Sequence, residues 1–241
     1  MTAEQPLLFH LTDAGIAWLT LNRPHVLNAM NMAVRDSLWD ALSAIVLDDD
    51  IRVVVFRGAG DRAFSAGADI SEFGTAPSYV ASRRARHERD IWGALTRTTK
   101  PLVASIHGVA YGAGCELALF CDLRIAAEDA RFALPEVALG YIPSAGGTQT
   151  LPRNIPPGVA RELVYTGDPI DARRALALGL VSRVVPRERL AAETLAVARA
   201  LAEQPPAALR ATKEAMQRAY ELPLDAGLRA ERAVAGRLAG R

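Results

Sequence analysis

The chain has 241 residues, of which half are hydrophobic and 23% are charged, a composition typical of one globular unit with a substantial core. Its formal net charge of +1 excludes a strong overall attraction to nucleic acid or to anionic membranes. No apolar run is long enough to span a membrane, and residues 1–6 lack the basic and apolar segments of a secretory signal.

The first 130 residues alternate between strand-like and helix-like patterns. Strands are predicted where apolar residues alternate or run together, at 7–11, 16–22, 53–56, 102–106 and 123–126. Helices are predicted over 32–47 and 79–98 and from residue 116 onward, and 58–69 is predicted to be a loop that ends at a helix start. Continuously apolar strands between helices indicate an α/β core with a sheet buried on both faces.

From Thr148 onward the pattern is mostly helical, with one short strand candidate over 180–185. Two prolines at 205–206 separate a predicted helix over 190–203 from another over 207–220. We therefore expect a core over residues 1–190 and a helical C-terminal region over 191–241.

The two cysteines, Cys115 and Cys121, lie six positions apart in one apolar stretch, which is a poor spacing for zinc. We expect buried, reduced thiols, as found in the cytoplasm. The four histidines show no metal-ligand spacing, so no metal is predicted; they are His10, His25, His87 and His107. His107 is expected to be packed in the core rather than catalytic.

Two glycine-rich segments, 108–116 and 134–148, each contain a glutamate, and a third segment, 64–70, is predicted to form a second tight backbone turn. Glycines let backbone N–H groups approach a ligand, and a nearby carboxylate can move protons, which is what an enzyme that forms an enolate requires. Glu116 follows Ala113 by about one helical turn, so both are expected to face one pocket. The alternative is a close-packed turn with a structural glutamate.

Glu136 follows Pro135 and has the apolar neighbours Leu134, Val137 and Leu139. Such neighbours would partly desolvate the carboxyl and raise its pKa toward neutrality, which suits proton transfer. The alternative is a glutamate in a first helical turn that is stabilised by the helix dipole.

Other familiar motifs are absent or incomplete. There is no Walker A sequence and no G-x-S-x-G elbow, and the segment from Gly112 lacks the last glycine of a dinucleotide fingerprint. A group of arginines is predicted to be the solvated face of a helix, with a phosphate or RNA site as the alternative; it comprises Arg83, Arg84, Arg86 and Arg89.

Taken together, the segments from about Leu19 to Glu231 resemble the crotonase superfamily, the enoyl-CoA hydratase/isomerase family. The resemblance is carried by Leu21-Asn22-Arg23-Pro24 with Asn28-Ala29-Met30, by Phe64 to Ile70, by Lys100-Pro101, by Gly108 to Leu117 and by Pro135 to Thr148. It implies a spiral of ββα units with a helical C-terminal region that usually mediates trimerisation. It also implies a coenzyme A thioester as substrate, with no cofactor beyond the coenzyme A that the substrate itself carries.

The resemblance assigns a role to each matching position. The backbone N–H groups of Ala68 and Ala113 would form an oxyanion hole, Glu116 would act as the base toward water, and Glu136 would deliver a proton to the α-carbon. CoA phosphates would lie near His25 and Arg62. Further substrate contacts are expected at Ala66, Asp69, Ile70, Gly112 and Ser144.

Because both family glutamates are present, the chain is expected to hydrate a 2-enoyl-CoA to a 3-hydroxyacyl-CoA. Alternatives are an enoyl-CoA isomerase, in which Glu136 alone is essential, another acyl-CoA hydrolase or lyase, or a non-catalytic CoA- or RNA-binding protein. A homotrimer or a hexamer is the expected assembly, without nucleic acid or membrane partners.

Two departures from the family pattern stand out. Ser144 occupies a position where hydratases commonly have glycine, and the chain after Glu231 is shorter than in most relatives. A shortened C-terminus would leave the acyl pocket more open or filled from another subunit. The segment 71–90, with Trp92 just beyond, is expected to cover an apolar acyl tail; its apolar residues are Phe73, Tyr79 and Val80.

Overall fold

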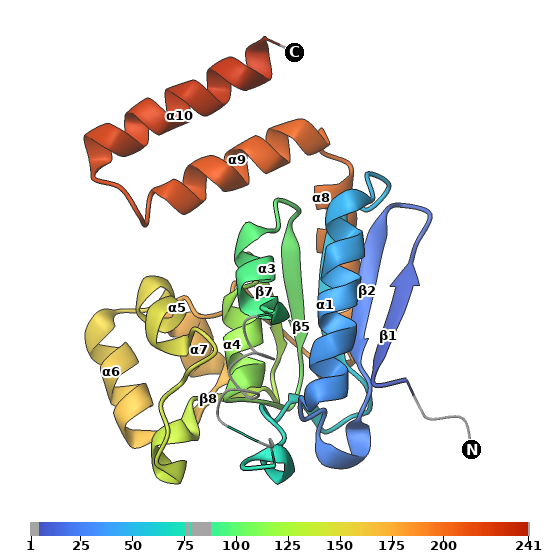
Figure 1. Ribbon diagram of the computed structural model, residues 1–241, viewed down its shortest axis with the longest axis vertical. Helices are drawn as coiled ribbons and strands as arrows, with labels where there is room; N and C mark the ends of the chain where they lie inside the picture. The colour runs from blue at the N-terminus through green and yellow to red at the C-terminus, as the bar shows by residue number, and fades with distance from the viewer. Residues whose placement is uncertain (1–4, 76–77, 79–87, 241) are drawn as a thin grey trace.

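The computed structural model describes residues 5–75, 78 and 88–240. Within them, six strands form the larger sheet in the order β1-β2-β3-β5-β7-β10, in which β1 is antiparallel to β2 and the other neighbours are parallel (Figure 1). The strands are β1 (Leu7–Leu11), β2 (Ile16–Leu21), β3 (Val53–Gly58), β5 (Leu102–Ile106), β7 (Leu123–Ala127) and β10 (Arg183–Val185). The predicted α/β core is thus confirmed.

A smaller sheet, in the order β4-β6-β8-β9, was not visible in the sequence pattern. Its strands are β4 (Ala63–Ser65), β6 (Val109–Tyr111), β8 (Arg131–Ala133) and β9 (Ile170–Asp171). The chain passes from β3 to β4, from β5 to β6 and from β7 to β8, so each step leads from the larger sheet to the smaller one. This repeated step is the predicted ββα spiral.

Of the predicted loop over 58–69 that ends at a helix start, the helix start is confirmed, but the prediction missed a strand inside the loop. This segment contains β4, and the turn after it is the 3-10 helix η2 (Ile70–Glu72), which the Asp69 side chain caps by accepting a hydrogen bond from the Ser71 N–H. A strand of three residues is too short to show an alternating pattern, which explains the error.

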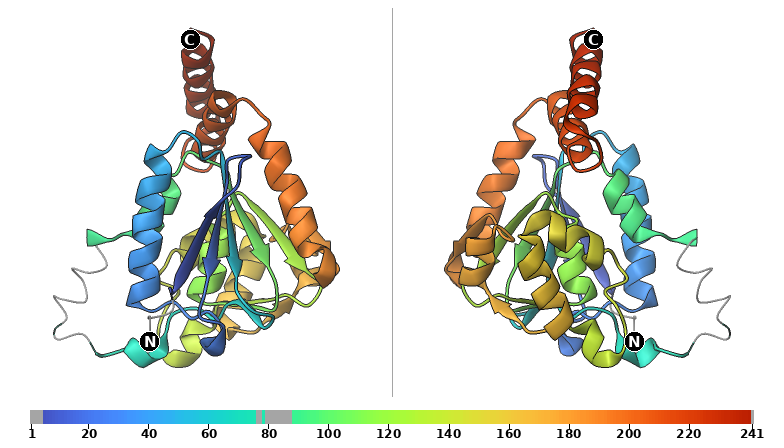
Figure 2. Two further views of the ribbon diagram at one scale, coloured as in Figure 1. Left: turned by 90° about the vertical axis from the view of Figure 1, so that its right-hand side faces the viewer. Right: turned by 90° about the vertical axis from the view of Figure 1, so that its left-hand side faces the viewer.

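Helices cover both faces of the larger sheet (Figure 2). On one face lie α1 (Met32–Leu47), α3 (Ile91–Arg97) and α4 (Ala113–Leu119), and on the other lies α8 (Leu190–Ala202). Successive residues of β3 from Val53 to Phe56 therefore pack on opposite faces of the sheet, and this part of the strand is apolar because neither face meets water, whereas Arg57 beyond it is exposed.

The helix prediction for 32–47 is confirmed, and Asn31 caps it by accepting the Val34 N–H. Of the helix predicted over 79–98, residues 79–87 lie outside the described residues, as do Arg83, Arg84 and Arg86, and the rest contains α3. Arg89 pairs with Asp36 at 2.8 Å.

The remaining helices follow in the second half of the chain. They are η3 (Pro135–Leu139), α5 (Gly147–Asn154), α6 (Pro157–Thr166), α7 (Ala172–Leu178), η4 (Arg187–Arg189), α9 (Pro206–Arg218) and α10 (Leu224–Ala239). The last two pack against each other as a hairpin that extends beyond the end of the sheet (Figure 1). Lys213 attaches this hairpin to the body by donating to the Lys100 carbonyl at 2.9 Å and to Asp122 at 2.7 Å. None of the helices in the described part of the chain is long and apolar enough to cross a membrane.

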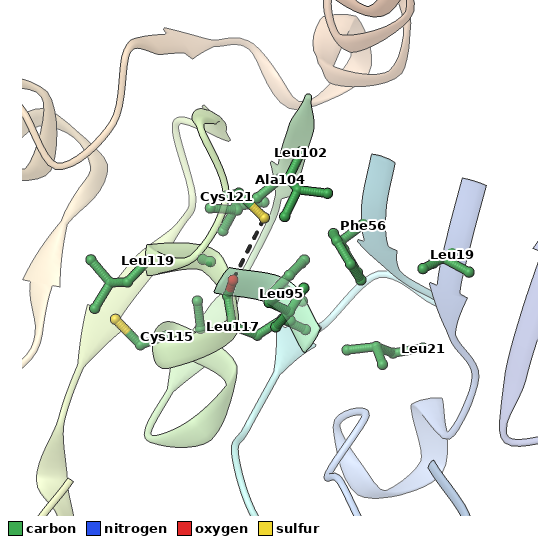
Figure 3. Close-up of a cluster of buried hydrophobic side chains, with 14 of the residues drawn as sticks. Leu19, Leu21, Phe56, Leu95, Leu102, Ala104, Cys115, Leu117, Leu119 and Cys121 are labelled. Atoms are coloured by element: carbon green, nitrogen blue, oxygen red, sulfur yellow. Dashed lines mark hydrogen bonds between the residues drawn. The ribbon is translucent and has the colours of Figure 1, made fainter. Parts of the chain in front are cut away.

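Both cysteines are buried and free, as predicted. They pack among leucines and alanines of α4 and the larger sheet, where the Cys121 thiol donates to the Leu117 carbonyl at 3.5 Å (Figure 3). Burial raises the pKa of both thiols, so neither is a reactive thiolate near neutral pH.

The side chain of Lys100 caps the C-terminal end of helix α1. Its ammonium group is buried and donates to the carbonyls of Ile45, at 2.6 Å, and Asp48, which have no partner within the helix. Burial lowers the pKa of this lysine, but the two carbonyls compensate for the lost hydration.

We predict that Lys100→Met lowers the free energy of unfolding by about 2 kcal/mol, because it leaves two carbonyls without their charged donor. Urea unfolding followed by circular dichroism at fixed protein concentration measures this. Arg173→Met, at an exposed position of α7, is the control and is expected to change stability by less than about 0.5 kcal/mol. Equal stability of the two variants would contradict the assigned role of Lys100.

Candidate active site

Two tight turns, one from each of two ββα units, meet at the smaller sheet. Gly67, in the turn after β4, has a φ of 100°, and a Cβ atom there would lie 2.8 Å from the Tyr111 carbonyl oxygen and 3.2 Å from the Ala113 nitrogen. Only glycine permits both this backbone conformation and this contact. The turn that holds Ala68 therefore lies directly against the turn that holds Ala113.

The Ala68 N–H points away from the neighbouring backbone. The Gly67 carbonyl accepts a hydrogen bond from the Met30 N–H at 2.7 Å, and the Met30 carbonyl accepts one from the Asp69 N–H at 3.1 Å. Because the C=O and N–H of a trans peptide point in opposite directions, the Ala68 N–H is directed away from Met30. It has no acceptor among the described residues.

The Ala113 N–H is the second free donor. The Gly112 carbonyl accepts the Glu116 N–H at 2.9 Å within the helix, so the Ala113 N–H, in the same peptide, points out of the helix start. It too has no acceptor within the described chain. The structure thus places the two predicted N–H donors on adjacent turns.

Glu116 is almost completely buried, and two backbone groups hold its carboxylate. Its Oε1 atom accepts hydrogen bonds from the N–H groups of Ala145, at 2.9 Å, and Gly147, at 2.7 Å. A Cβ atom at position 147 would lie 2.9 Å from this oxygen, so glycine is needed there. Burial raises the pKa of Glu116 to about 7, against the opposing effect of the two N–H donors.

Glu136 lies on η3, close to the Gly112 turn. A Cβ atom at Gly112 would be 3.1 Å from the Glu136 Oε1 atom, while Oε2 is buried and has no hydrogen-bond partner among the described residues. Burial raises the pKa of this carboxyl, as predicted, and its charge contributes to the raised pKa of Glu116. The two carboxyl groups are therefore electrostatic neighbours beside the two free N–H donors.

The two basic residues expected to lie near the CoA phosphates are on two segments that pack together. His25 is exposed on η1 (Pro24–Val26), and Arg62 is exposed just before β4. Gly60 packs against Pro24, since a Cβ there would lie 2.9 Å from the proline Cβ, so the two segments are adjacent. Both basic side chains are exposed, so an anionic group can reach them.

The remaining predicted contacts differ in what they offer a ligand. The Asp69 carboxylate is occupied, because it accepts hydrogen bonds from Arg23 at 2.8 Å and from the Ser71 hydroxyl at 2.6 Å, and its pKa is lowered by these bonds. It holds the turn rather than a substrate. Ala66 donates its N–H to the Leu27 carbonyl, whereas Ile70 and Ser144 are exposed.

Sequence reasoning missed the two donors that hold Glu116 and an aromatic stack beneath them. Trp92 stacks on Phe120 with ring centroids 5.7 Å apart, and Phe120 lies against Gly146. The paired glycines at 146–147 were the available signal for a close approach. His107, by contrast, is packed as predicted, and burial lowers its pKa to about 4.

Comparison with known proteins defines the class. The model of the family described as enoyl-CoA hydratase/isomerase matches residues 12–239, and the chain belongs to this family. Its fold is the crotonase fold, since it superimposes on an enoyl-CoA hydratase subunit from Geobacillus kaustophilus with a TM-score of 0.91 and 40% identity, covering 98% of this chain and 90% of that one.

Individual relatives are similarly close in sequence. The chain is 42% identical over 214 residues to the 2,3-dehydroadipyl-CoA hydratase of Escherichia coli K12, covering 89% of this chain and 83% of that protein. It is 36% identical over 219 residues to the crotonyl-CoA hydratase of Syntrophomonas wolfei, covering 91% and 84%. Its similarity to these acyl-CoA hydratases agrees with its membership of the enoyl-CoA hydratase/isomerase family.

We predict that Glu116→Gln raises the melting temperature at pH 8 and that this gain shrinks toward pH 5. The folded-state pKa of Glu116, about 7, lies above the ordinary value of 4.5, so the folded protein binds the extra proton between these values. The stability of the wild type therefore falls as pH rises through this window. The amide of the glutamine variant is neutral at every pH, so it avoids the cost of a buried charge while it keeps an acceptor oxygen.

Differential scanning calorimetry at pH 5 and pH 8 measures this difference. Glu162→Gln, at an exposed position of α6, is the control and is expected to show no such pH-dependent gain. A gain for Glu116→Gln that is equal at both pH values would show that the carboxyl is not destabilised by burial.

Proposed function

We propose that this chain is an enoyl-CoA hydratase, which adds water across the 2,3 double bond of a 2-enoyl-CoA to give a 3-hydroxyacyl-CoA, a reaction of fatty acid metabolism. The observation that carries the proposal is the pair of buried carboxyl groups, Glu116 and Glu136, beside two free backbone N–H groups. An oxyanion site alone would serve many reactions of a thioester, whereas addition of water needs a base and an acid as well.

The two N–H groups account for activation of the thioester. When the Ala68 and Ala113 N–H groups donate to the thioester oxygen, they stabilise the negative charge that develops there as water adds to C3. Each such donor contributes about 3 kcal/mol to lowering the barrier in comparable sites. Because both donors belong to the backbone, their position depends on the turns that carry them and not on the side chains of Ala68 and Ala113 themselves.

The two glutamates divide the proton transfers. Glu116, as carboxylate, removes a proton from water while the water oxygen bonds to C3. The electron pair of the double bond moves onto the thioester oxygen, which forms an enolate. Glu136, as acid, then gives its proton to C2 while the enolate collapses. Glu116 ends protonated and Glu136 ionised, so exchange of one proton with solvent restores the pair.

The surroundings of the site support an apolar acyl group. Phe73, after η2, and Tyr141, after η3, meet edge to face with ring centroids 5.4 Å apart, and both are partly exposed. Ile70 and Ile142 are exposed on the same two segments. The basic residues His25 and Arg62 would lie near the CoA phosphates. No cofactor is needed beyond the coenzyme A of the substrate.

The assembly that we propose is a homotrimer or a dimer of trimers, with the α9–α10 hairpin at subunit contacts. This is supported by large apolar side chains exposed on and between these helices: Met216, Tyr220, Leu224, Leu228 and Leu238. The two free, buried thiols support a reducing compartment, which we take to be the cytoplasm.

We predict that the protein hydrates crotonyl-CoA and that Glu116→Gln and Glu136→Gln each lower kcat by at least about a hundredfold, because each removes one of two proton transfers. Loss of the conjugated enoyl absorbance measures the rate. The control is that both variants keep the native circular dichroism spectrum and still bind an unreactive acyl-CoA.

Other outcomes would identify other functions. Double-bond migration that needs Glu136 but not Glu116 would identify an isomerase, and release of free thiol would identify a hydrolase. Salt-dependent RNA binding without turnover would point to a binding protein. Near-wild-type hydration by either variant would contradict the two-carboxylate mechanism.

The raised pKa values predict the pH dependence of the reaction. We expect kcat/KM for crotonyl-CoA to rise with pH through about 7, as the free enzyme's Glu116 ionises, and to fall once the coupled pair has lost its shared proton. Initial rates at low substrate between pH 5 and 9 measure this. A profile that is flat between pH 5 and 8 would show that no group with a raised pKa takes part.

A further inference from the structure

Ser65, the last residue of β4, is completely buried between the two turns that carry the free N–H donors. Its hydroxyl donates to the Asn28 carbonyl at 2.8 Å and accepts the Gly67 N–H at 3.2 Å. A serine hydroxyl is both donor and acceptor, and both capacities are used here. The proposed proton transfers do not involve this hydroxyl, which lies behind the site.

The same residue also contacts the second turn. A Cβ atom at Gly114 would lie 2.4 Å from the Ser65 carbonyl oxygen and 2.7 Å from its Cβ, so the backbone of Ser65 is packed directly against the residue that follows Ala113. Ser65 thus touches one donor-bearing turn through its hydroxyl and the other through its backbone and Cβ.

The partner of the hydroxyl is itself held rigidly. Asn28 is buried, and its amide donates to the carbonyls of Ala59, at 2.9 Å, and Ala63, at 2.8 Å, while its side-chain oxygen accepts the Arg23 N–H at 3.0 Å. Its φ of 56° is left-handed, a conformation that asparagine tolerates better than most residues. The carbonyl that receives the Ser65 hydroxyl is therefore fixed by three side-chain hydrogen bonds.

We propose that Ser65 is a positioning residue that sets the direction and spacing of the Ala68 N–H relative to the Ala113 N–H. Gly67 has no side chain to restrict it, so besides its packing against the Tyr111–Ala113 backbone its peptide groups are held by two hydrogen-bond partners: Ser65 for its N–H and Met30 for its carbonyl. Without the hydroxyl, one of these two anchors is lost, and the following peptide, which carries the Ala68 N–H, gains freedom to rotate.

This inference rests on the proposed function, because it assigns both N–H groups to the thioester oxygen. Oxyanion donors act within a narrow distance range, and a displacement of about 1 Å can lower a rate by about a hundredfold. A purely structural role predicts something different: the variant would be less stable, but its folded molecules would turn over and polarise a bound thioester normally.

The test is Ser65→Ala, measured in the full-length protein with crotonyl-CoA. We expect kcat to fall about ten- to a hundredfold while KM changes by less than about threefold, because the residues proposed to bind CoA, His25 and Arg62, are unchanged. Binding of 4-dimethylaminocinnamoyl-CoA gives an independent readout, since donors on its thioester oxygen shift its absorbance to longer wavelength. The variant is expected to bind this probe with a smaller shift than the wild type.

Ser105→Ala is the matched control. Ser105 is also buried, and its hydroxyl accepts a hydrogen bond from Thr194 at 2.9 Å, on the face of the larger sheet that α8 covers. The Ser105→Ala variant loses a comparable buried hydrogen bond. We therefore expect it to be less stable, with kcat and the probe shift within about twofold of the wild type. If Ser65→Ala does not fold, Ser65→Cys, which keeps a weak donor and acceptor, is measured in its place, with a smaller loss of kcat and of shift expected.

Unchanged kcat and unchanged probe shift in a folded Ser65 variant would overturn the proposal, as would equal losses in Ser105→Ala. The result is separable from failure of the proposed function. If the wild type shifts the probe but does not hydrate crotonyl-CoA, hydration is wrong, and the probe shift of the variant still decides the role of Ser65. If the wild type does not shift the probe at all, the oxyanion site is absent and the positioning role falls with it.

Discussion

The close approach of two backbone turns is the constraint on which the site depends. Gly67 lies against the Tyr111–Ala113 backbone at a distance that excludes any side chain, and this contact exists because β4 and β6 are neighbours in the smaller sheet. Each ββα unit delivers one turn to the same place. The fold therefore brings two free N–H groups together from residues 45 positions apart without using a functional side chain.

The carboxyl groups are arranged around this contact by a similar use of glycine. Gly112 leaves room for one oxygen of Glu136, and Gly147 allows its own N–H to reach Glu116. Larger residues at these positions would push the carboxyl groups away from the donors. Gly67, Gly112 and Gly147 thus mark close approaches of backbone to backbone and of backbone to carboxylate, and not flexibility.

Secondary-structure elements whose pattern extends over many residues could be predicted from the sequence. Helix 32–47 and the strands at 7–11 and 102–106 match the structure because each has a long apolar pattern or a clear cap. The strands of the smaller sheet have at most three residues each and could not be recognised from periodicity.

The site was predictable only in part, for a related reason. The two glutamates stand out because each lies in a glycine-rich or apolar segment, and the family resemblance adds their pairing. The contact of Glu116 with Ala145 and Gly147 spans about thirty positions, and backbone donors have no signature of their own. Ser65 and Asn28 look like ordinary small polar residues, and only their burial and their partners distinguish them.

The hydrogen bonds that hold Glu116 also explain how this carboxylate can be buried and still act as a base. A buried carboxylate is usually paired with a cation, but an arginine or lysine in contact would lower its pKa and make it a weak base. Among the described residues, the groups that act on its pKa are two backbone N–H donors and a second carboxyl, and no cation is among them. The donors fix the position of one oxygen while burial keeps the pKa near neutrality. The site thus combines a defined geometry with a basic carboxylate, at a cost in stability that a salt bridge would have reduced.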